Sequence, residues 1–170
     1  MRRFIGAIAM ATLVGVGAVA LQTGAAAAEP TRSVEFTGAS VFEFGSSGCS
    51  FVHQLFDATL TTNRGDTLHI EGCVELVGSP FPFTGTFVID SPGRRDVTGT
   101  VSGVVGTAPS DTCSVDLIAV GFDFVLTPTS DTGRPAPPLQ LDGTWCSPAV
   151  PGVAGPISGT LTGALPPGRG

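Results

Sequence analysis

From residue 32 onward, apolar and polar residues alternate with a period of two along most of the chain. The alternating stretches are rich in Val, Ile, Phe and Thr, and clusters of Gly, Pro, Ser and Asp separate them. This pattern is typical of half-buried β-strands joined by turns, and no stretch has a convincing helical period. The sequence therefore predicts eight strands, at residues 33–43, 51–62, 66–77, 82–90, 96–105, 113–126, 138–146 and 156–164.

The second and third of these strands form the best-specified hairpin. Asn63-Arg64-Gly65 is typical of a three-residue loop with Gly65 in the left-handed conformation, which places Thr62 opposite Asp66. In this register the apolar residues of both strands share one face, and they are Val52, Phe56, Ala58, Leu60, Leu68, Ile70, Val74 and Leu76.

A second hairpin, through residues 91–95, places Phe87 opposite Gly99 and Phe83 opposite Gly103. An aromatic ring that covers a strand glycine lets a sheet coil tightly. A loose repeat of apolar, polar, Gly, Thr and apolar residues recurs in this hairpin and in the last two strands. Strong coiling favours a single eight-stranded antiparallel barrel, with a β-sandwich as the alternative. Its interior is either filled or left partly hollow, depending on six phenylalanines at inward positions: Phe36, Phe56, Phe83, Phe87, Phe122 and Phe124.

Four cysteines predict two disulfides. A register that sets Cys113 opposite Cys146, with Ile118 among the inward residues, favours that pair. Cys49 and Cys73 then pair by elimination, although an extended strand would carry Cys49 roughly 20 Å away from Cys73. Either the segment from residue 48 to 52 folds back as a loop, or this second pairing is wrong.

The first 28 residues have the layout of a secretory signal peptide, which forms a helix ahead of the barrel. Arg2 and Arg3 precede an apolar run from Phe4 to Leu21, and small residues follow as far as Ala28. We expect cleavage after Ala28, with an uncleaved membrane anchor as the alternative. Residues 29–170 then form one secreted domain.

The mature part carries six arginines against nine Asp and five Glu, a formal charge of −8. This charge disfavours nucleic acid and anionic membranes as partners. Signatures of hydrolases, metalloproteases, phosphate loops and calcium loops are missing, so we expect no cofactor and no structural metal.

One polar patch could carry chemistry. The predicted hairpin sets polar side chains on its outer face, where two imidazoles and three carboxylates could bind a divalent metal or act as acid and base. Because functional sites usually occupy concave pockets, the favoured interpretation is a solvated outer face. The patch consists of His53 facing Glu75, Asp57 facing Glu71, and His69 on the same face.

Two stretches carry resemblances. Gly143-Thr144-Trp145 resembles the G-x-W motif that opens the first strand of lipocalins, but here it lies in the penultimate strand, and Trp145 is interpreted as a core residue. Residues 81–106, with F-T-G-T-F-V-I-D and T-G-T-V-S-G, resemble small exported bacterial proteins with barrels similar to allene oxide cyclase and dirigent proteins. This resemblance implies an eight-stranded barrel and no particular substrate, and no catalytic residue of those families maps onto this chain.

The leading functional hypothesis is a secreted, non-catalytic module that binds a small apolar ligand or an extracellular protein or glycan. One alternative is a barrel enzyme, either an isomerase or cyclase, or a hydrolase using the pairs His53/Glu75 and Asp57/Glu71. Another is a protease inhibitor that presents the loop from Thr127 to Pro138.

Overall fold

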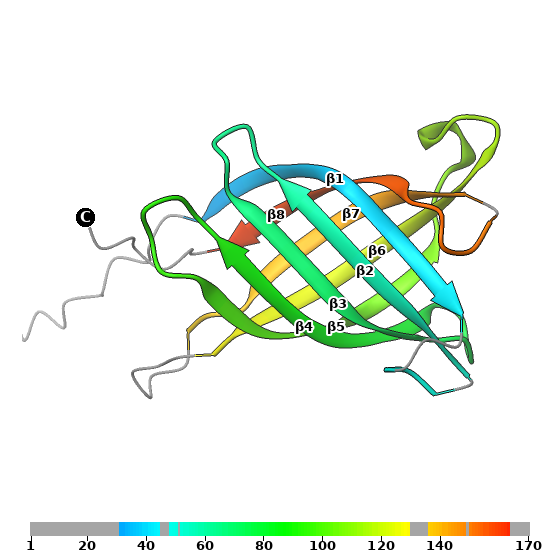
Figure 1. Ribbon diagram of the computed structural model, residues 1–170, viewed down its shortest axis with the longest axis horizontal. Helices are drawn as coiled ribbons and strands as arrows, with labels where there is room; N and C mark the ends of the chain where they lie inside the picture. Colours follow the sequence, from blue (N-terminus) through cyan, green and yellow to red (C-terminus); the bar gives the residue numbers. More distant parts are fainter. Residues whose placement is uncertain (1–30, 45–47, 51, 130–135, 149, 164–170) are drawn as a thin grey trace, which may run out of the picture.

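The computed structural model is a single closed barrel of eight antiparallel strands, described for residues 31–44, 48–50, 52–129, 136–148 and 150–163 (Figure 1). Successive strands are neighbours, and β1 closes the barrel by pairing with both β2 and β8. The predicted barrel is therefore confirmed, and the sandwich alternative is wrong. The elements are β1 (Arg32–Phe44), β2 (His53–Thr61), β3 (Thr67–Glu75), β4 (Phe81–Asp90), β5 (Val97–Thr107), the short 3-10 helix η1 (Ser110–Thr112), β6 (Leu117–Pro128), β7 (Leu139–Pro148) and β8 (Gly155–Gly163).

The two predicted hairpins have the registers that their turns specify. Gly65 has a φ of +85°, and the amide of Thr62 donates to the carbonyl of Asp66 at 2.9 Å. The amide of Asp66 donates in return to the side-chain oxygen of Thr62 at 3.1 Å. In the second hairpin Phe87 lies opposite Gly99, as predicted.

Glycines on the inner face allow the sheet to coil under aromatic rings. A Cβ atom on Gly99 would lie 2.6 Å from the ring of Phe87, so the predicted cover of this glycine is confirmed. Phe83 is opposite Gly103 as predicted, but a Cβ on Gly72 would lie 2.7 Å from its ring, and Phe124 covers Gly103 instead. Because these contacts leave no room for a side chain, the tight curvature of the barrel depends on glycine at these positions.

Side chains fill the middle of the barrel. The six phenylalanines predicted to point inward are all buried. Phe83 stacks on Phe124 with ring centroids 4.5 Å apart, and Phe56 meets Phe83 edge-on at 5.6 Å. Each fully buried Phe stabilises the fold by about 1.5–3 kcal/mol, so this aromatic cluster is a major source of stability.

The predicted register of β6 and β7 is wrong. Cys146 lies opposite Ala119, and Cys113 precedes β6 in the connection that contains η1. Because this connection is a loop rather than strand, β6 begins only at Leu117. Ile118, predicted to be inward, lies at the rim of the barrel with 58% of its surface exposed.

The barrel has two different ends. The turn end carries the connections at residues 62–66, 91–96 and 129–138, together with the start of β1 and the end of β8. The mouth end carries the connections at residues 45–52, 76–80, 108–116 and 149–154. In Figure 1 the turn end is on the left and the mouth end on the right.

Two sequence-based predictions concern residues outside the described part. The signal peptide at residues 1–28 is one, and residues 130–135 of the loop considered for protease inhibition are the other. In the described part, no helix has the length and apolar character that a membrane span requires.

Candidate functional site

A hollow of about 260 Å³ opens at the mouth end of the barrel. Its lining is almost entirely apolar, and the described residues that form it include no ionisable side chain. We call it the mouth hollow; it is lined by Phe42, Gln54, Val74, Leu76, Phe81, Val105, Ile118, Val120, Trp145, Ser147, Pro148, Val150, Pro151 and Val153.

Two stacked aromatic rings form the floor of the mouth hollow. Phe42 from β1 and Trp145 from β7 have ring centroids 3.9 Å apart and planes inclined by 15°. Phe56 meets both rings edge-on, at 5.3 Å from Phe42 and 6.0 Å from Trp145. Trp145 is buried, as predicted for a core residue, and it also borders the hollow. The floor is therefore continuous with the packed core and is fixed in place by it.

Gly155 makes room for the indole of Trp145. A Cβ atom at this position would lie 3.0 Å from the indole nitrogen and 2.1 Å from the carbonyl oxygen of Cys146. Ser40 lies directly opposite Gly155 across the pairing of β1 with β8. Within the described part, the hydroxyl of Ser40 and the indole N–H of Trp145 are buried and have no hydrogen-bond partner. Two unsatisfied polar atoms thus border Gly155, which is an unfavourable arrangement for stability.

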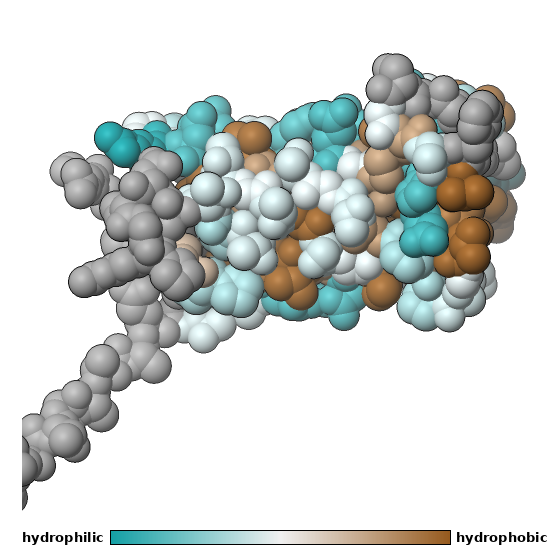
Figure 2. Space-filling model, turned by 90° about the horizontal axis from the view of Figure 1, so that it is seen from below, coloured by the Kyte–Doolittle hydropathy of each residue, from teal (hydrophilic) through white to brown (hydrophobic). Residues whose placement is uncertain are grey.

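Exposed apolar side chains surround the mouth hollow. Of the large hydrophobic residues that are exposed in the described part, all but Val104 on β5 lie in or beside the connections of the mouth end. Figure 2 shows hydrophobic side chains gathered at this end, on the right of the view. Such a concentration is typical of an interaction surface. Leu76, Ile118, Val150 and Val153 line the hollow, whereas Val52, Val77, Val104 and Val115 lie outside its lining.

Two disulfides fasten two of the four mouth-end connections to the outside of the barrel. Cys113 in the β5–β6 connection is bonded to Cys146 on β7, with Cα atoms 5.6 Å apart. Cys49 in the β1–β2 connection is bonded to Cys73 on β3, with Cα atoms 5.8 Å apart. Two disulfides indicate an oxidising environment, extracellular or periplasmic.

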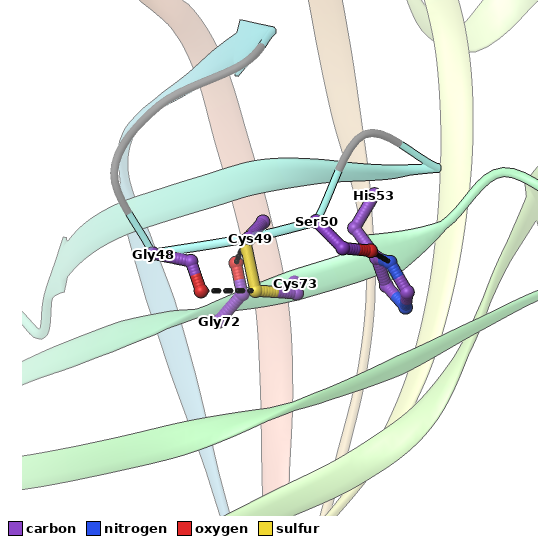
Figure 3. The surroundings of a disulfide bond; sticks show 6 residues. All are labelled: Gly48, Cys49, Ser50, His53, Gly72 and Cys73. Carbon is purple, nitrogen blue, oxygen red and sulfur yellow. Dashed lines mark hydrogen bonds between the residues drawn. A yellow bond between two sulfur atoms is a disulfide. The ribbon is translucent and has the colours of Figure 1, made fainter.

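The described part of the β1–β2 connection folds back against β3, which decides between the two alternatives left open by the sequence. Figure 3 shows Cys49 beside Cys73, with Gly48 lying over the same strand. The amide of Leu76 donates to the carbonyl of Val52 at 2.9 Å, and the amide of His53 donates to the carbonyl of Ser50 at 2.8 Å. The chain therefore turns at residues 50–53 before β2 begins, and the long separation expected of an extended strand does not arise.

The polar patch predicted from the sequence lies on the outer wall of β2 and β3, and none of its residues lines the mouth hollow. The register pairs His53 with Glu75 and Asp57 with Glu71, as predicted. The Nδ1 atom of His69 lies 3.7 Å from the Oδ1 atom of Asp57, and both side chains are nearly half exposed.

Two further hydrogen bonds hold the imidazoles of this patch. The side-chain oxygen of Thr59 lies 3.2 Å from the Nδ1 atom of His69, and Ser50 is hydrogen-bonded to the Nδ1 atom of His53 (Figure 3). Among the described residues, no three His, Cys, Asp or Glu side chains are arranged to hold a metal ion. The patch is a solvent-facing network of local contacts.

Sequence reasoning missed the mouth hollow. The alternating pattern assigned Leu76 and Ile118 to the inward face, and these residues do lie on that side, but at the rim rather than in the core. The one available signal was the presence of apolar residues between the last two predicted strands, namely Val150 and Val153.

Comparisons of this chain with protein families, with curated proteins and with solved structures find no match.

Proposed function

We propose that this protein is an exported, non-catalytic binding protein that holds a small apolar ligand in the mouth hollow. The observation that carries the proposal is an apolar hollow with an aromatic floor at one end of a barrel. Small-molecule sites are typically concave and mainly apolar, with a few polar groups that orient the ligand. Gln54 and Ser147 are the polar residues of the lining.

The packed interior favours a site at the end of the barrel over one along its axis. Phe56, Phe83 and Phe124 occupy the middle of the barrel and contact one another. An eight-stranded barrel is just wide enough to be filled in this way. The ligand therefore rests on Phe42 and Trp145 and remains open to solvent on one side.

The chemistry of the lining favours binding over catalysis. General acid and base catalysis requires an ionisable group within hydrogen-bond reach of the substrate. The described lining offers none, and His53 and His69 belong to the outer wall. The resemblance of residues 81–106 to exported barrels similar to allene oxide cyclase and dirigent proteins is consistent with an exported barrel and assigns no substrate.

Fluorescence tests this proposal directly, because Trp145 is the single tryptophan of the chain and borders the hollow. The mature protein is titrated with N-phenyl-1-naphthylamine, an uncharged apolar fluorophore. We expect saturable probe emission together with energy transfer from Trp145. Absence of saturable binding would overturn the proposal.

Matched variants locate the bound probe. Ile118→Ser removes about 40 Å² of apolar contact from the lining, which weakens binding roughly five-fold. Val115→Ser changes a fully exposed residue of the same end that lies outside the lining, and it leaves the Kd unchanged. Equal Kd values for the two variants would place the probe elsewhere and contradict the proposal.

A further inference from the structure

Two polar side chains interrupt the apolar inner face of the barrel at the mouth end. Gln54 on β2 lies one inward position from Phe56, and Ser147 on β7 lies one inward position from Trp145, in both cases on the side of the mouth. Trp145 is part of the aromatic floor, and Phe56 packs against it edge-on. Both polar residues therefore lie directly above the floor, in a lining that is otherwise apolar.

The side-chain amide of Gln54 is unpaired. Gln54 is half-buried and lies opposite Val74, a core residue of β3. Within the part of the chain that the structure describes, its amide makes no hydrogen bond. An amide that is shielded from water without a partner costs free energy, so a ligand group that pairs with it gains affinity. Because the amide has N–H donors and a carbonyl acceptor, its full complement is a group that both accepts and donates.

Ser147 adds an acceptor to the lining. Its hydroxyl already donates to the carbonyl of Pro148 at 3.1 Å, so its oxygen has only lone pairs to offer a ligand. The described lining contains no ionisable side chain, and a charged ligand group beside the floor would lose water without meeting an opposite charge. The polar residues of the hollow therefore suit an uncharged group that carries an N–H or O–H as well as a carbonyl.

The depths of the polar and apolar residues favour one orientation of the ligand. Leu76 follows the end of β3, and Val150 and Val153 belong to the β7–β8 connection. These three lining residues are 40%, 60% and 47% exposed, so the outer part of the lining is apolar. Gln54 and Ser147 lie deeper. A ligand with its polar group inward matches both layers, whereas the opposite orientation mismatches both.

From these observations we propose that the ligand of the mouth hollow is an uncharged amphiphile with a carboxamide-like head and one apolar chain, bound with its head inward. The inference rests on the proposed function, since it concerns the same hollow. The head pairs with the amide of Gln54 beside the aromatic floor. The chain extends outward over Leu76, Val150 and Val153. Gln54 is then the residue that selects the head group.

A displacement series with one acyl chain tests the head group. Octanamide, methyl octanoate and octanoate each compete with N-phenyl-1-naphthylamine for the mature protein, below the concentration at which micelles form. Methyl octanoate accepts hydrogen bonds but donates none, and as the more apolar compound it would bind more tightly to a purely apolar hollow. We expect the reverse order, with octanamide roughly three-fold tighter, because only the amide pairs fully with Gln54. Octanoate, which is ionised at neutral pH, should bind at least roughly ten-fold more weakly than octanamide.

Matched glutamine variants assign this order to one side chain. Gln54→Leu removes the amide at similar volume, so it should keep the affinity for the probe and restore the preference for methyl octanoate. Gln54→Met, which keeps the unbranched shape of glutamine, should give the same reversal. Gln140→Leu is the control, because Gln140 lies on the outer face of β7 and is hydrogen-bonded to Asp123. It should leave the order unchanged.

Brominated amides test the orientation. Bromine quenches indole fluorescence at short range, and Trp145 is the single tryptophan of the chain. At equal occupancy we expect 2-bromooctanamide, with bromine beside the head, to quench Trp145 more strongly than 8-bromooctanamide. Stronger quenching by 8-bromooctanamide would place the chain end on the floor and overturn the inward head.

The outcomes separate this inference from the proposed function. If the probe binds saturably but methyl octanoate competes as well as octanamide or better, the head-group inference falls and the binding function stands. A preference for octanamide that both Gln54 variants retain also overturns the head-group inference. If the probe does not bind saturably, both proposals fall.

Discussion

The two ends of the barrel differ in the residues that form their connections and in what holds those connections in place. At the turn end, the β2–β3 and β4–β5 connections are short hairpins with a glycine in the left-handed conformation, and arginines and aspartates surround them. At the mouth end, the connections carry Leu76 and most of the exposed valines, Ile118 lies beside one of them, and two of the connections are fastened by disulfides. The turn end closes strands with local backbone chemistry, whereas the mouth end holds an apolar surface in place by covalent bonds.

This difference has a physical reason. A polar hairpin gains from contact with water and needs little support from the rest of the fold. An apolar connection gains nothing from contact with water. A constraint from outside the connection is therefore required to hold it in one conformation. The disulfides at Cys73 and Cys146 provide that constraint from the outer wall and leave the hollow free.

Among the variants that test this comparison, removal of a disulfide is expected to have the largest effect on the free energy of unfolding. The double variant Cys113→Ser/Cys146→Ser should lose about 3.5 kcal/mol of the free energy of unfolding, because the bond closes a loop spanning 33 residues in sequence. Urea denaturation measures this loss. The double variant Cys49→Ser/Cys73→Ser should lose a similar amount. If both lose less than about 1 kcal/mol, the covalent constraint is not what holds the mouth end.

A matched pair of glycine substitutions compares the ends through the backbone alone. Gly65 at the turn end and Gly152 at the mouth end have φ values of +85° and +76°, and a Cβ at either position meets no close neighbour. Alanine at each position should therefore cost about 1–2 kcal/mol of stability, the penalty for left-handed backbone. Only Gly152→Ala should also weaken N-phenyl-1-naphthylamine binding, because Gly152 lies between Val150 and Val153. Equal probe affinity in both variants would contradict the role of that connection.

Ser40→Ala tests the unsatisfied polar atoms beneath the mouth hollow. Because the buried hydroxyl has no partner in the described part, its removal should raise the free energy of unfolding by about 1 kcal/mol. Ser147→Ala is the control, since the hydroxyl of Ser147 already donates to the carbonyl of Pro148 at 3.1 Å. A loss of stability in Ser40→Ala would indicate that this hydroxyl has a partner in solution.

The outer wall between the two ends should contribute least. Asp57→Asn changes the exposed contact with His69 and should alter the free energy of unfolding by less than about 0.5 kcal/mol. Probe binding in the mouth hollow should not change at all. A larger loss of stability, or any loss of probe affinity, would indicate that the polar patch has a functional role.

The sequence was informative where local chemistry fixes the geometry. Gly65 dictated the register of β2 and β3, and the alternation of both strands agreed with it, so Leu55 lies opposite Cys73 as that turn requires. The sequence between β6 and β7 runs from residue 129 to 138, which is too long for a two- or three-residue turn to specify the register. The prediction that Cys113 and Cys146 face each other across neighbouring strands is therefore wrong in its register, because Cys146 lies opposite Ala119 and the disulfide reaches a loop instead.

The alternating sequence pattern does not predict the mouth hollow. A period of two reports which face of a sheet a residue occupies, but it does not report how far along the barrel the residue lies. Trp145 and Ile118 have the same inward direction, yet Trp145 belongs to the core and Ile118 to the rim. Only the lengths and stagger of all eight strands together determine where the packed interior stops.

The pairing of β1 with both β2 and β8 limits how other chains can approach this molecule. In an open sheet, the outermost strands present free backbone donors and acceptors, and other chains can extend the sheet by adding a strand. Here the ladder between residues 32–40 of β1 and residues 155–163 of β8 uses those groups within the molecule. These backbone groups are therefore not available for self-association by strand addition.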